Sequence, residues 1–158
     1  MIEIRCRLRL VDEPTAGMAP HERMELIALV AGIVRDRGLT VLFTEHGLLF
    51  EADVLAGQKT GHFLDQRDNR ALVAGMVAGR RVLDLFASTG GFTVHAAAGG
   101  AKEVVSVDLS APTLAVAERN LVRNQHVPKV AACAQHSIVG DAFEVLRDLA
   151  AAGERFDV

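Results

Sequence analysis

One stretch of this chain, residues 81–92, constrains the fold more than any other. It reads RVLDLFASTGGF: a short apolar run stops at a turn with two glycines, Gly90 and Gly91, and a helical pattern follows. This order is typical of the first unit of a nucleotide-binding α/β sheet. Glycine has no Cβ, so a ligand can approach the backbone, and the next helix offers free N–H groups. An ordinary strand-to-helix turn is the alternative, because a glycine turn alone is a weak motif.

Acidic residues stand at the ends of the predicted strands in this half of the chain. The run EVVSVD ends in Asp108, and a third strand precedes Asp141. Because open α/β sheets bind ligands at the carboxyl ends of their strands, Asp84, Asp108 and Asp141 are candidates for a binding site. Asp108 can accept both hydroxyls of a ribose, and we expect it to be free for a ligand because Ser110 is better placed to cap the next helix. A capping box with Glu144 fully explains Asp141 as an alternative.

The first 46 residues predict a strand, a helix and a second strand. Apolar and charged side chains alternate over residues 2–10, apolar residues recur at helical spacing after Pro20, and residues 39–44 read LTVLFT. A polar segment, residues 57–70, leads into another predicted helix. The expected buried face of that helix consists of Leu72, Val73, Met76 and Val77.

Composition limits the classes of function. The chain has 158 residues, half of them apolar, and a formal net charge of −3, which gives no bulk attraction to nucleic acid. No apolar run is long enough to cross a bilayer and no signal peptide begins the chain, so we expect a cytoplasmic protein without membrane association. The two cysteines, Cys6 and Cys133, lack paired or metal-ligand spacing, so no disulfide or metal site is predicted.

The N-terminal segment, about residues 8–46, carries a first resemblance. Its runs LVDEPTAGMAPHE and GLTVLFTEH resemble the Walker B to switch-histidine segment of branched-chain amino-acid ABC transporter ATPases. The resemblance implies a magnesium-supporting Asp12, a water-polarising Glu13 and a γ-phosphate contact at His46. No G-x-x-x-x-G-K-[ST] loop exists in the chain, so we prefer a structural interpretation of these residues: a turn, a helix approach and a surface histidine. An ATPase remnant stays the alternative function.

A second resemblance covers about residues 47–158. The motifs GQKTGHFLDQRDNR, VLDLFASTGGFTVHAAAGGAKEVVSVDLS and VGDAFEVL resemble those of RlmI-like class I methyltransferases, which use S-adenosylmethionine (SAM) to make 5-methylcytosine in large-subunit ribosomal RNA. The absence of G-x-G-x-x-G disfavours a dinucleotide. The resemblance implies an α/β fold with a partial Rossmann-like methyltransferase sheet, SAM as cofactor and ribosomal RNA as partner.

The same resemblance implies a cofactor site. Asp84 and the glycine turn would hold the methionine end of SAM, Asp108 would bind the ribose, and Asp141 with Ala142 would face the adenine. The predicted cofactor-binding residues are Gln66, Arg67, Asp84, Ala87, Ser88, Thr89, Gly90, Gly91, Asp108, Asp141 and Ala142. The family's catalytic cysteine follows a D-P-P motif beyond the fourth strand, and neither cysteine of this chain occupies its place, so no catalytic residue is assigned.

The two resemblances meet near residues 45–47, which suggests a hybrid chain. We expect an ATPase-like segment at 1–46, a truncated methyltransferase domain at 47–158, and the start of a fourth strand at 156–158. Half a sheet would leave the edge of the strand at 81–85 unpaired, so we expect the strand at 39–45 or at 2–10 to pack there. A non-enzymatic remnant without a ligand is the third interpretation.

Overall fold

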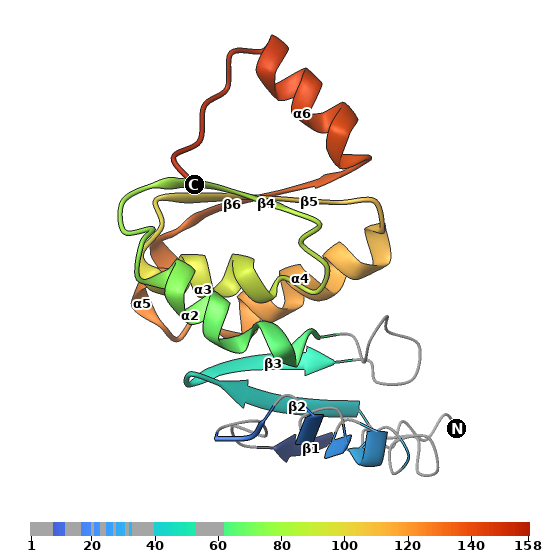
Figure 1. The fold of residues 1–158 in the computed structure, drawn as a ribbon. Helices are drawn as coiled ribbons and strands as arrows, with labels where there is room; N and C mark the ends of the chain where they lie inside the picture. Colours follow the sequence, from blue (N-terminus) through green and yellow to red (C-terminus); the bar gives the residue numbers. More distant parts are fainter. Residues whose placement is uncertain are drawn as a thin grey trace, which may run out of the picture. The chain divides into compact units, whose positions relative to one another are not determined.

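Two compact units, Met1–Arg67 and Asp68–Val158, make up the computed structural model of this chain (Figure 1). Each has its own three-stranded sheet and is described here by itself. The structure describes residues 8–11, 17–19, 21–22, 25–26, 28–30, 32, 40–52 and 62–158. The boundary expected at 46/47 rests on where two resemblances meet. A division by compactness does not test it, so it stays a prediction.

The sheet of the first unit has the order β1-β2-β3, with β1 at Leu8–Val11, β2 at Thr40–Glu45 and β3 at Leu48–Ala52. β1 and β2 are parallel, and the described residues between them include helical ones at 21–22, 25–26, 28–30 and 32. The predicted strand, helix and strand are therefore confirmed over the described part. Asp12 and Glu13 lie outside it.

A tight hairpin joins β2 to β3. Its two turn residues, His46 and Gly47, have φ angles of 50° and 76°, and positive φ at both positions is typical of a type I′ turn. His46 is thus an exposed turn residue, as the structural interpretation of this histidine expects. Behind the hairpin, the buried ring of His62 lies 4.7 Å from the ring of Phe43, and its Nε2 lies 3.5 Å from a carboxylate oxygen of buried Glu45.

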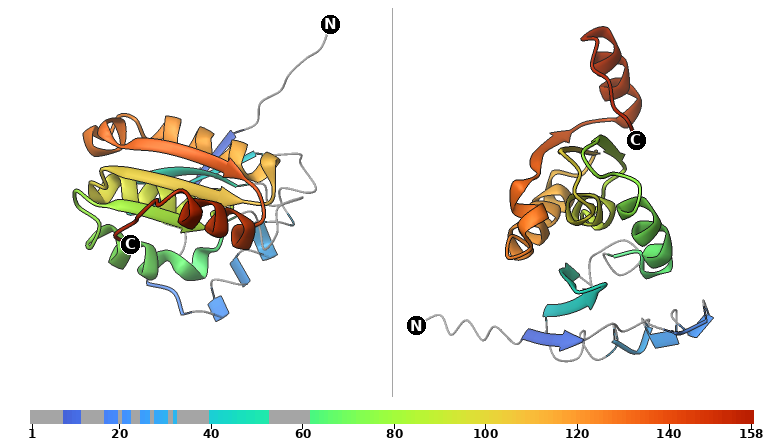
Figure 2. Two further views of the ribbon diagram at one scale, coloured as in Figure 1. Left: turned by 90° about the horizontal axis from the view of Figure 1, so that it is seen from above. Right: turned by 90° about the vertical axis from the view of Figure 1, so that its left-hand side faces the viewer.

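The second unit is built on a parallel sheet in the order β4-β5-β6, formed by Arg81–Leu85, Glu103–Asp108 and Ala134–Val139. Helices α3 (Gly91–Gly99), α4 (Ala111–Arg123) and α5 (Pro128–Ala132) lie on one side of this sheet, and α6 (Ala142–Ala151) lies on the other (Figures 1 and 2). A 3-10 turn, Leu64–Gln66, leads into α2 (Arg67–Ala74). Over the described residues, no helix combines the length and apolar character that crossing a membrane requires.

Alternation along the strands gives each face of this sheet its own core. Val105 and Val107 of β5 pack with Val145 of α6, and partly buried neighbours such as Leu83 join them. Residues one position away, such as Val104, face α3 and α4 because successive side chains of a strand point to opposite faces. Asp84 pairs in register with Ser106 and shares this second face. The strand pattern read from the sequence is therefore confirmed.

Of the apolar face predicted for the helix that follows residue 70, Val77 is buried as expected, but Leu72 and Met76 are not. Leu72 of α2 is 64% exposed instead of buried, and Met76 is also exposed. Arg70 is the buried residue of this helix, with its guanidinium carbon 5.9 Å from the ring centroid of Phe92. This contact with an aromatic face lets a charged residue take the inner side, which a purely apolar pattern cannot indicate. A further short helix, α5, lies between α4 and β6.

The outer edge of β4 is paired by the last residues of the chain. The N–H of Leu83 donates to the carbonyl of Val158 at 2.9 Å, and the N–H of Asp157 donates to the carbonyl of Arg81 at 2.8 Å. The N–H of Val158 also reaches the Arg81 carbonyl, which gives the donor–acceptor pattern of a parallel pair. No strand is assigned at 156–158, so of the expected fourth strand only these backbone hydrogen bonds of Asp157 and Val158 are present.

The expectation that the strand at 39–45 or at 2–10 covers this edge is wrong for the described residues. β2 lies between β1 and β3 in a separate sheet. The Arg81 side chain helps to hold the C-terminal segment at β4 instead: its Nη1 donates to the carbonyl of Arg155 at 2.8 Å, and its Nη2 lies 2.9 Å from Glu154 Oε2. Ion pairs with Glu103 and Glu154 raise the pKa of Arg81 further above its usual value.

Candidate functional site

A glycine bend, residues 86–91, connects β4 to α3. Phe86 and Ser88 have positive φ angles, 58° and 50°, and Gly90 has 78°. A Cβ on Gly90 would lie 2.7 Å from the Cβ of Ala117, closer than two carbons approach, so glycine alone fits against α4 here. Gly90 makes no side-chain cap for α3, which leaves the first N–H groups of this helix without a capping side chain.

Asp84 lies at the carboxyl end of β4, under the first turn of α3. Its Oδ2 accepts a hydrogen bond from the Thr93 hydroxyl at 2.6 Å. Burial raises the pKa of the Asp84 carboxyl to about 6; the bond from Thr93 acts in the opposite direction, and the negative charge of Asp108 raises the pKa further.

Asp108, at the end of β5, accepts hydrogen bonds from the loop that follows β4 and from the loop that follows β5. Its Oδ2 accepts the N–H of Ser88 at 2.9 Å, and its Oδ1 accepts the N–H of Ser110 at 2.9 Å. Asp108 thus accepts two backbone amides, and its availability to a ligand stays a prediction. The cap at Ser110 is confirmed, since its Oγ accepts from Thr113 N. Each carboxylate oxygen has two lone pairs, so each keeps one acceptor position for a ligand.

The third loop, after β6, carries Asp141 and Ala142. Asp141 caps α6, because its Oδ1 accepts the N–H groups of Phe143 at 2.9 Å and Glu144 at 3.2 Å. The capping role predicted for Asp141 is confirmed. Ala142 is buried. The N–H of Gly140 donates to the backbone carbonyl of Asp108 at 3.0 Å, so this loop continues the carboxyl edge of the sheet.

The structure thus brings most of the predicted cofactor residues to one edge of the second unit. Hydrogen bonds link Asp84 to α3, and link the glycine bend to Asp108. The bend is also fixed to α4, where the side chain of buried Asn120 donates to the Thr89 carbonyl at 3.0 Å. Gln66 and Arg67 belong to the first unit, so their place beside this edge stays a prediction; Gln66 Nε2 donates to Asp65 Oδ2 at 3.3 Å.

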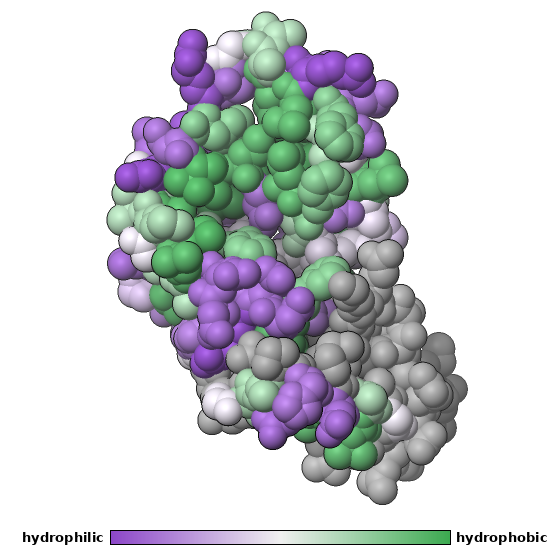
Figure 3. All heavy atoms as spheres, viewed as in Figure 1, coloured by the Kyte–Doolittle hydropathy of each residue, from purple (hydrophilic) through white to green (hydrophobic). Residues whose placement is uncertain are grey.

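Exposed apolar side chains at the same edge were missed in the sequence. They lie directly after β4 and β5, at the last position of β6 and in the first turn of α6: Phe86, Leu109, Val139 and Phe143. Phe86 is 67% exposed and Phe143 69% exposed, and their ring centroids lie 6.5 Å apart in an edge-to-face arrangement. Figure 3 shows hydrophobic residues at the surface in the part of the molecule that contains α6. In the sequence, an apolar residue next to a buried strand cannot be told from a core residue, so no local signal identifies them.

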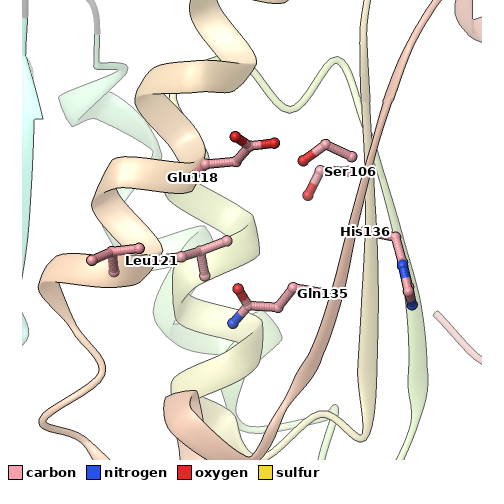
Figure 4. A pocket seen from close by; sticks show the side chains of 7 residues that line it. Ser106, Glu118, Leu121, Gln135 and His136 are labelled. Carbon is pink, nitrogen blue, oxygen red and sulfur yellow. The ribbon is translucent and has the colours of Figure 1, made fainter.

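A pocket of about 210 Å³ lies between α4 and the strands β5 and β6 (Figure 4). Glu118 points across it toward Ser106, and the amide of Gln135 points into it. No residue that lines this pocket belongs to the predicted cofactor set. Ser106 nevertheless connects the pocket to the site, because its hydroxyl lies 2.7 Å from that of Thr93.

Cys133 is a buried free thiol whose Sγ donates to the carbonyl of Ala134 at 3.4 Å. Burial raises the pKa of this thiol, and the negative charge of Glu103 raises it further. A nucleophilic cysteine is favoured by a lowered pKa, and the surroundings of Cys133 act in the opposite direction. Cys6 lies outside the described residues.

A parallel sheet with a glycine bend after β4 and carboxylates at two successive strand ends defines a nucleoside-binding α/β fold of the class I methyltransferase type. A family model described as S-adenosylmethionine-dependent methyltransferase matches residues 36–152. The chain belongs to this family of SAM-dependent methyltransferases.

Individual relatives agree with this assignment. A ribosomal RNA large subunit methyltransferase from Deinococcus radiodurans is 42% identical over 150 residues, which are 95% of this chain and 34% of the relative. A SAM-dependent methyltransferase from Streptococcus mutans has a similar fold, with a TM-score of 0.67, 24% identity and coverage of 95% of this chain and 44% of that chain. A methyltransferase solved with S-adenosylhomocysteine (SAH) gives a TM-score of 0.64 and 25% identity over the same shares of the two chains.

The chain spans about a third of the length of the Deinococcus relative. Because 150 of the 158 residues align with that methyltransferase, the alignment extends through most of residues 8–46. The resemblance of this segment to ABC transporter ATPases therefore finds no support, and an ATPase remnant is not favoured.

Proposed function

We propose that this chain supplies the SAM-binding part of a methyltransferase that acts on large-subunit ribosomal RNA. The observation that carries the proposal is the hydrogen-bonded arrangement of Asp84, the glycine bend and Asp108 at one edge of a parallel sheet. The family match supports SAM as the cofactor, and the name of the Deinococcus relative supports ribosomal RNA as the substrate.

The residues at this edge fit the chemistry of SAM. The first turn of α3 and the bend offer backbone N–H groups, and Asp84 offers a negative charge for the cationic methionine end. Asp108 keeps one acceptor position on each oxygen for the two ribose hydroxyls. When bound, SAM supplies an electrophilic methyl group from its sulfonium.

The adenine is assigned to the apolar side chains at this edge. Phe143 and Leu109 are exposed and follow the ends of neighbouring strands, so they can cover the faces of a flat aromatic ring. Asp141 retains its second oxygen, Oδ2, for which no amide donor is described, as an acceptor for the adenine amino group. Buried Ala142 would only form the floor beneath this ring.

The RNA substrate and the position of the methyl group are further parts of the proposal. The resemblance to the RlmI-like family supports carbon 5 of a cytosine as the atom that receives the methyl group. Action on ribosomal RNA supports the cytoplasm as the location of the protein. The covalent cysteine that this chemistry needs is not Cys133, given its burial and raised pKa.

Calorimetric titration of the full chain with SAH and with SAM tests the proposal. We expect binding by the wild type, at least tenfold weaker binding by Phe143→Ala, and no measurable binding by Asp108→Ala. Asp148→Ala, on the exposed surface of α6, is the matched control and should bind as the wild type does. Because Asp108 also holds two backbone amides, circular dichroism must show that Asp108→Ala is folded. A wild type that binds neither compound, or binds magnesium-ATP instead, would contradict the proposal.

A further inference from the structure

Two hydroxyl groups lie beside Asp84, one in the first turn of α3 and one in β5. Thr93 is 1% exposed and Ser106 is 3% exposed. The Thr93 hydroxyl donates its one hydrogen to Asp84 Oδ2 at 2.6 Å. Ser106 Oγ lies 2.7 Å from Thr93 Oγ1, and while Asp84 is ionised Ser106 is the donor of that second bond, because Thr93 has already given its hydrogen to the carboxylate. The three groups therefore form a row of two hydrogen bonds, in which Ser106 donates to Thr93 and Thr93 donates to Asp84.

The direction in which these two hydrogen bonds are donated depends on the charge of Asp84. An ionised carboxylate only accepts hydrogen bonds, so it requires both hydroxyls to point toward it. A protonated Asp84 can donate to Thr93 instead, which turns the hydroxyl hydrogen of Ser106 toward the pocket beside Glu118 (Figure 4). That pocket can hold water, because its 210 Å³ exceeds the volume of several water molecules and its walls are partly polar.

We propose that Thr93 and Ser106 are positioning residues that hold Asp84 ionised and oriented for the amino group of the methionine end of SAM. This inference rests on the proposed function and deepens it. A hydrogen bond to a carboxylate stabilises its charged form. Binding of the cofactor's ammonium group then depends on pH through two residues that do not touch the cofactor.

Other charged or titratable groups near Asp84 come from β5, α3 and α4. Asp108, from the end of β5, adds a negative charge. From α3, His95 uses Nδ1 for a bond with the Gly91 carbonyl at 2.8 Å. From α4, Glu118 faces Ser106 across the pocket. Of these groups, Asp108 is the one whose charge acts on Asp84 directly and disfavours the ionised form.

The first test follows the Asp84 carboxyl itself in the full chain, without cofactor, by NMR titration of ¹³C-labelled aspartate, with Asp84→Asn to assign the signal. We expect a wild-type midpoint near pH 6. Thr93→Val should raise the midpoint by about one pH unit, because one charge-stabilising hydrogen bond is lost. Thr93→Ser keeps the hydroxyl and should match the wild type, and Ser106→Ala should give a smaller rise. Equal midpoints in Thr93→Val and Thr93→Ser would overturn the proposal. If Thr93→Val does not fold, an unchanged midpoint in Ser106→Ala overturns it.

The second test measures affinity for SAH and for 5′-methylthioadenosine, which lacks the amino acid end, at pH 6.5 and pH 8. For Thr93→Val we expect SAH binding about threefold weaker at pH 6.5 and within twofold of the wild type at pH 8, with unchanged methylthioadenosine binding at both. An equal loss of SAH affinity at both pH values would show a merely structural role. If the wild type binds neither compound, the proposed function fails, while the NMR midpoints still decide whether the hydroxyls control Asp84.

Discussion

Replacing Asp84 by asparagine should stabilise the folded chain at neutral pH, although it removes a residue assigned to the cofactor. The native pKa of about 6 is higher than the ordinary aspartate pKa of 3.8, so the folded state holds this proton more tightly than the unfolded state does. The stability that Asp84 contributes is complete below pH 3.8 and is lost as the pH rises through 6. Asparagine has the shape of the protonated acid and does not titrate, so it keeps the bond from Thr93 at every pH.

The size of the effect follows from the two pKa values. Their separation corresponds to about 3 kcal/mol above pH 6, of which about 2 kcal/mol falls between pH 4.5 and pH 7.5. We therefore expect the free energy of unfolding of Asp84→Asn, minus that of the wild type, to grow by about 2 kcal/mol across this range. Urea titrations of both proteins at pH 4.5, 5.5, 6.5 and 7.5 measure this difference directly.

Asp148→Asn is the matched control, since Asp148 is exposed on α6. Its effect should stay within about 0.5 kcal/mol at every pH. A difference between Asp84→Asn and the wild type that is constant with pH would refute the reasoning, because only titration of a buried carboxyl makes the gap grow. Lower stability of Asp84→Asn at pH 7.5 would refute it as well.

Three further changes test the packing of the second unit. Gly90→Ala places a Cβ 2.7 Å from that of Ala117 at a positive φ, so we expect a loss of about 2–4 kcal/mol in urea unfolding, with Gly79→Ala, where no atom lies within 4 Å, losing less. Asp141→Ala removes the cap of α6 and should cost about 1 kcal/mol; no change would argue against the cap. Arg81→Met removes the ion pair to Glu154 and should speed amide exchange at the C-terminus, measured by hydrogen–deuterium exchange; unchanged protection would mean that the backbone pairing suffices.

Much of the second unit could be predicted because its sequence signals are local. Apolar runs ended by a glycine turn indicate buried parallel strands, and Ser110 and Asp141 cap their helices as their spacing predicts. The face of α2 could not be predicted, because the contact between Arg70 and Phe92 joins residues far apart in the sequence. The same holds for the edge of β4, since nothing local shows that Val158 returns to Leu83.

The candidate site shows the same division between local and long-range information. The acidic residues could be found because each stands where a strand ends. The two amides that Asp108 accepts, from Ser88 and Ser110, could not, because they depend on how the loops close around it. The exposure of Phe86 was also hidden, since an apolar residue that extends a buried strand reads as core.

The last residues of the chain bond to the outer edge of β4. This strand therefore has a hydrogen-bonded neighbour on each side and lies inside the sheet instead of at its edge. From β4 the chain builds outward through β5 to β6, then crosses back over the opposite face by way of α6 and adds residues 157–158 beyond β4. The direction in which strands are laid down thus reverses at β4, and such reversal points are where open α/β sheets accept ligands. A ligand bound at Asp84 would therefore contact β4, the strand that has β5 on one side and residues 157–158 on the other. We expect its binding to make the sheet more rigid, beginning at β4.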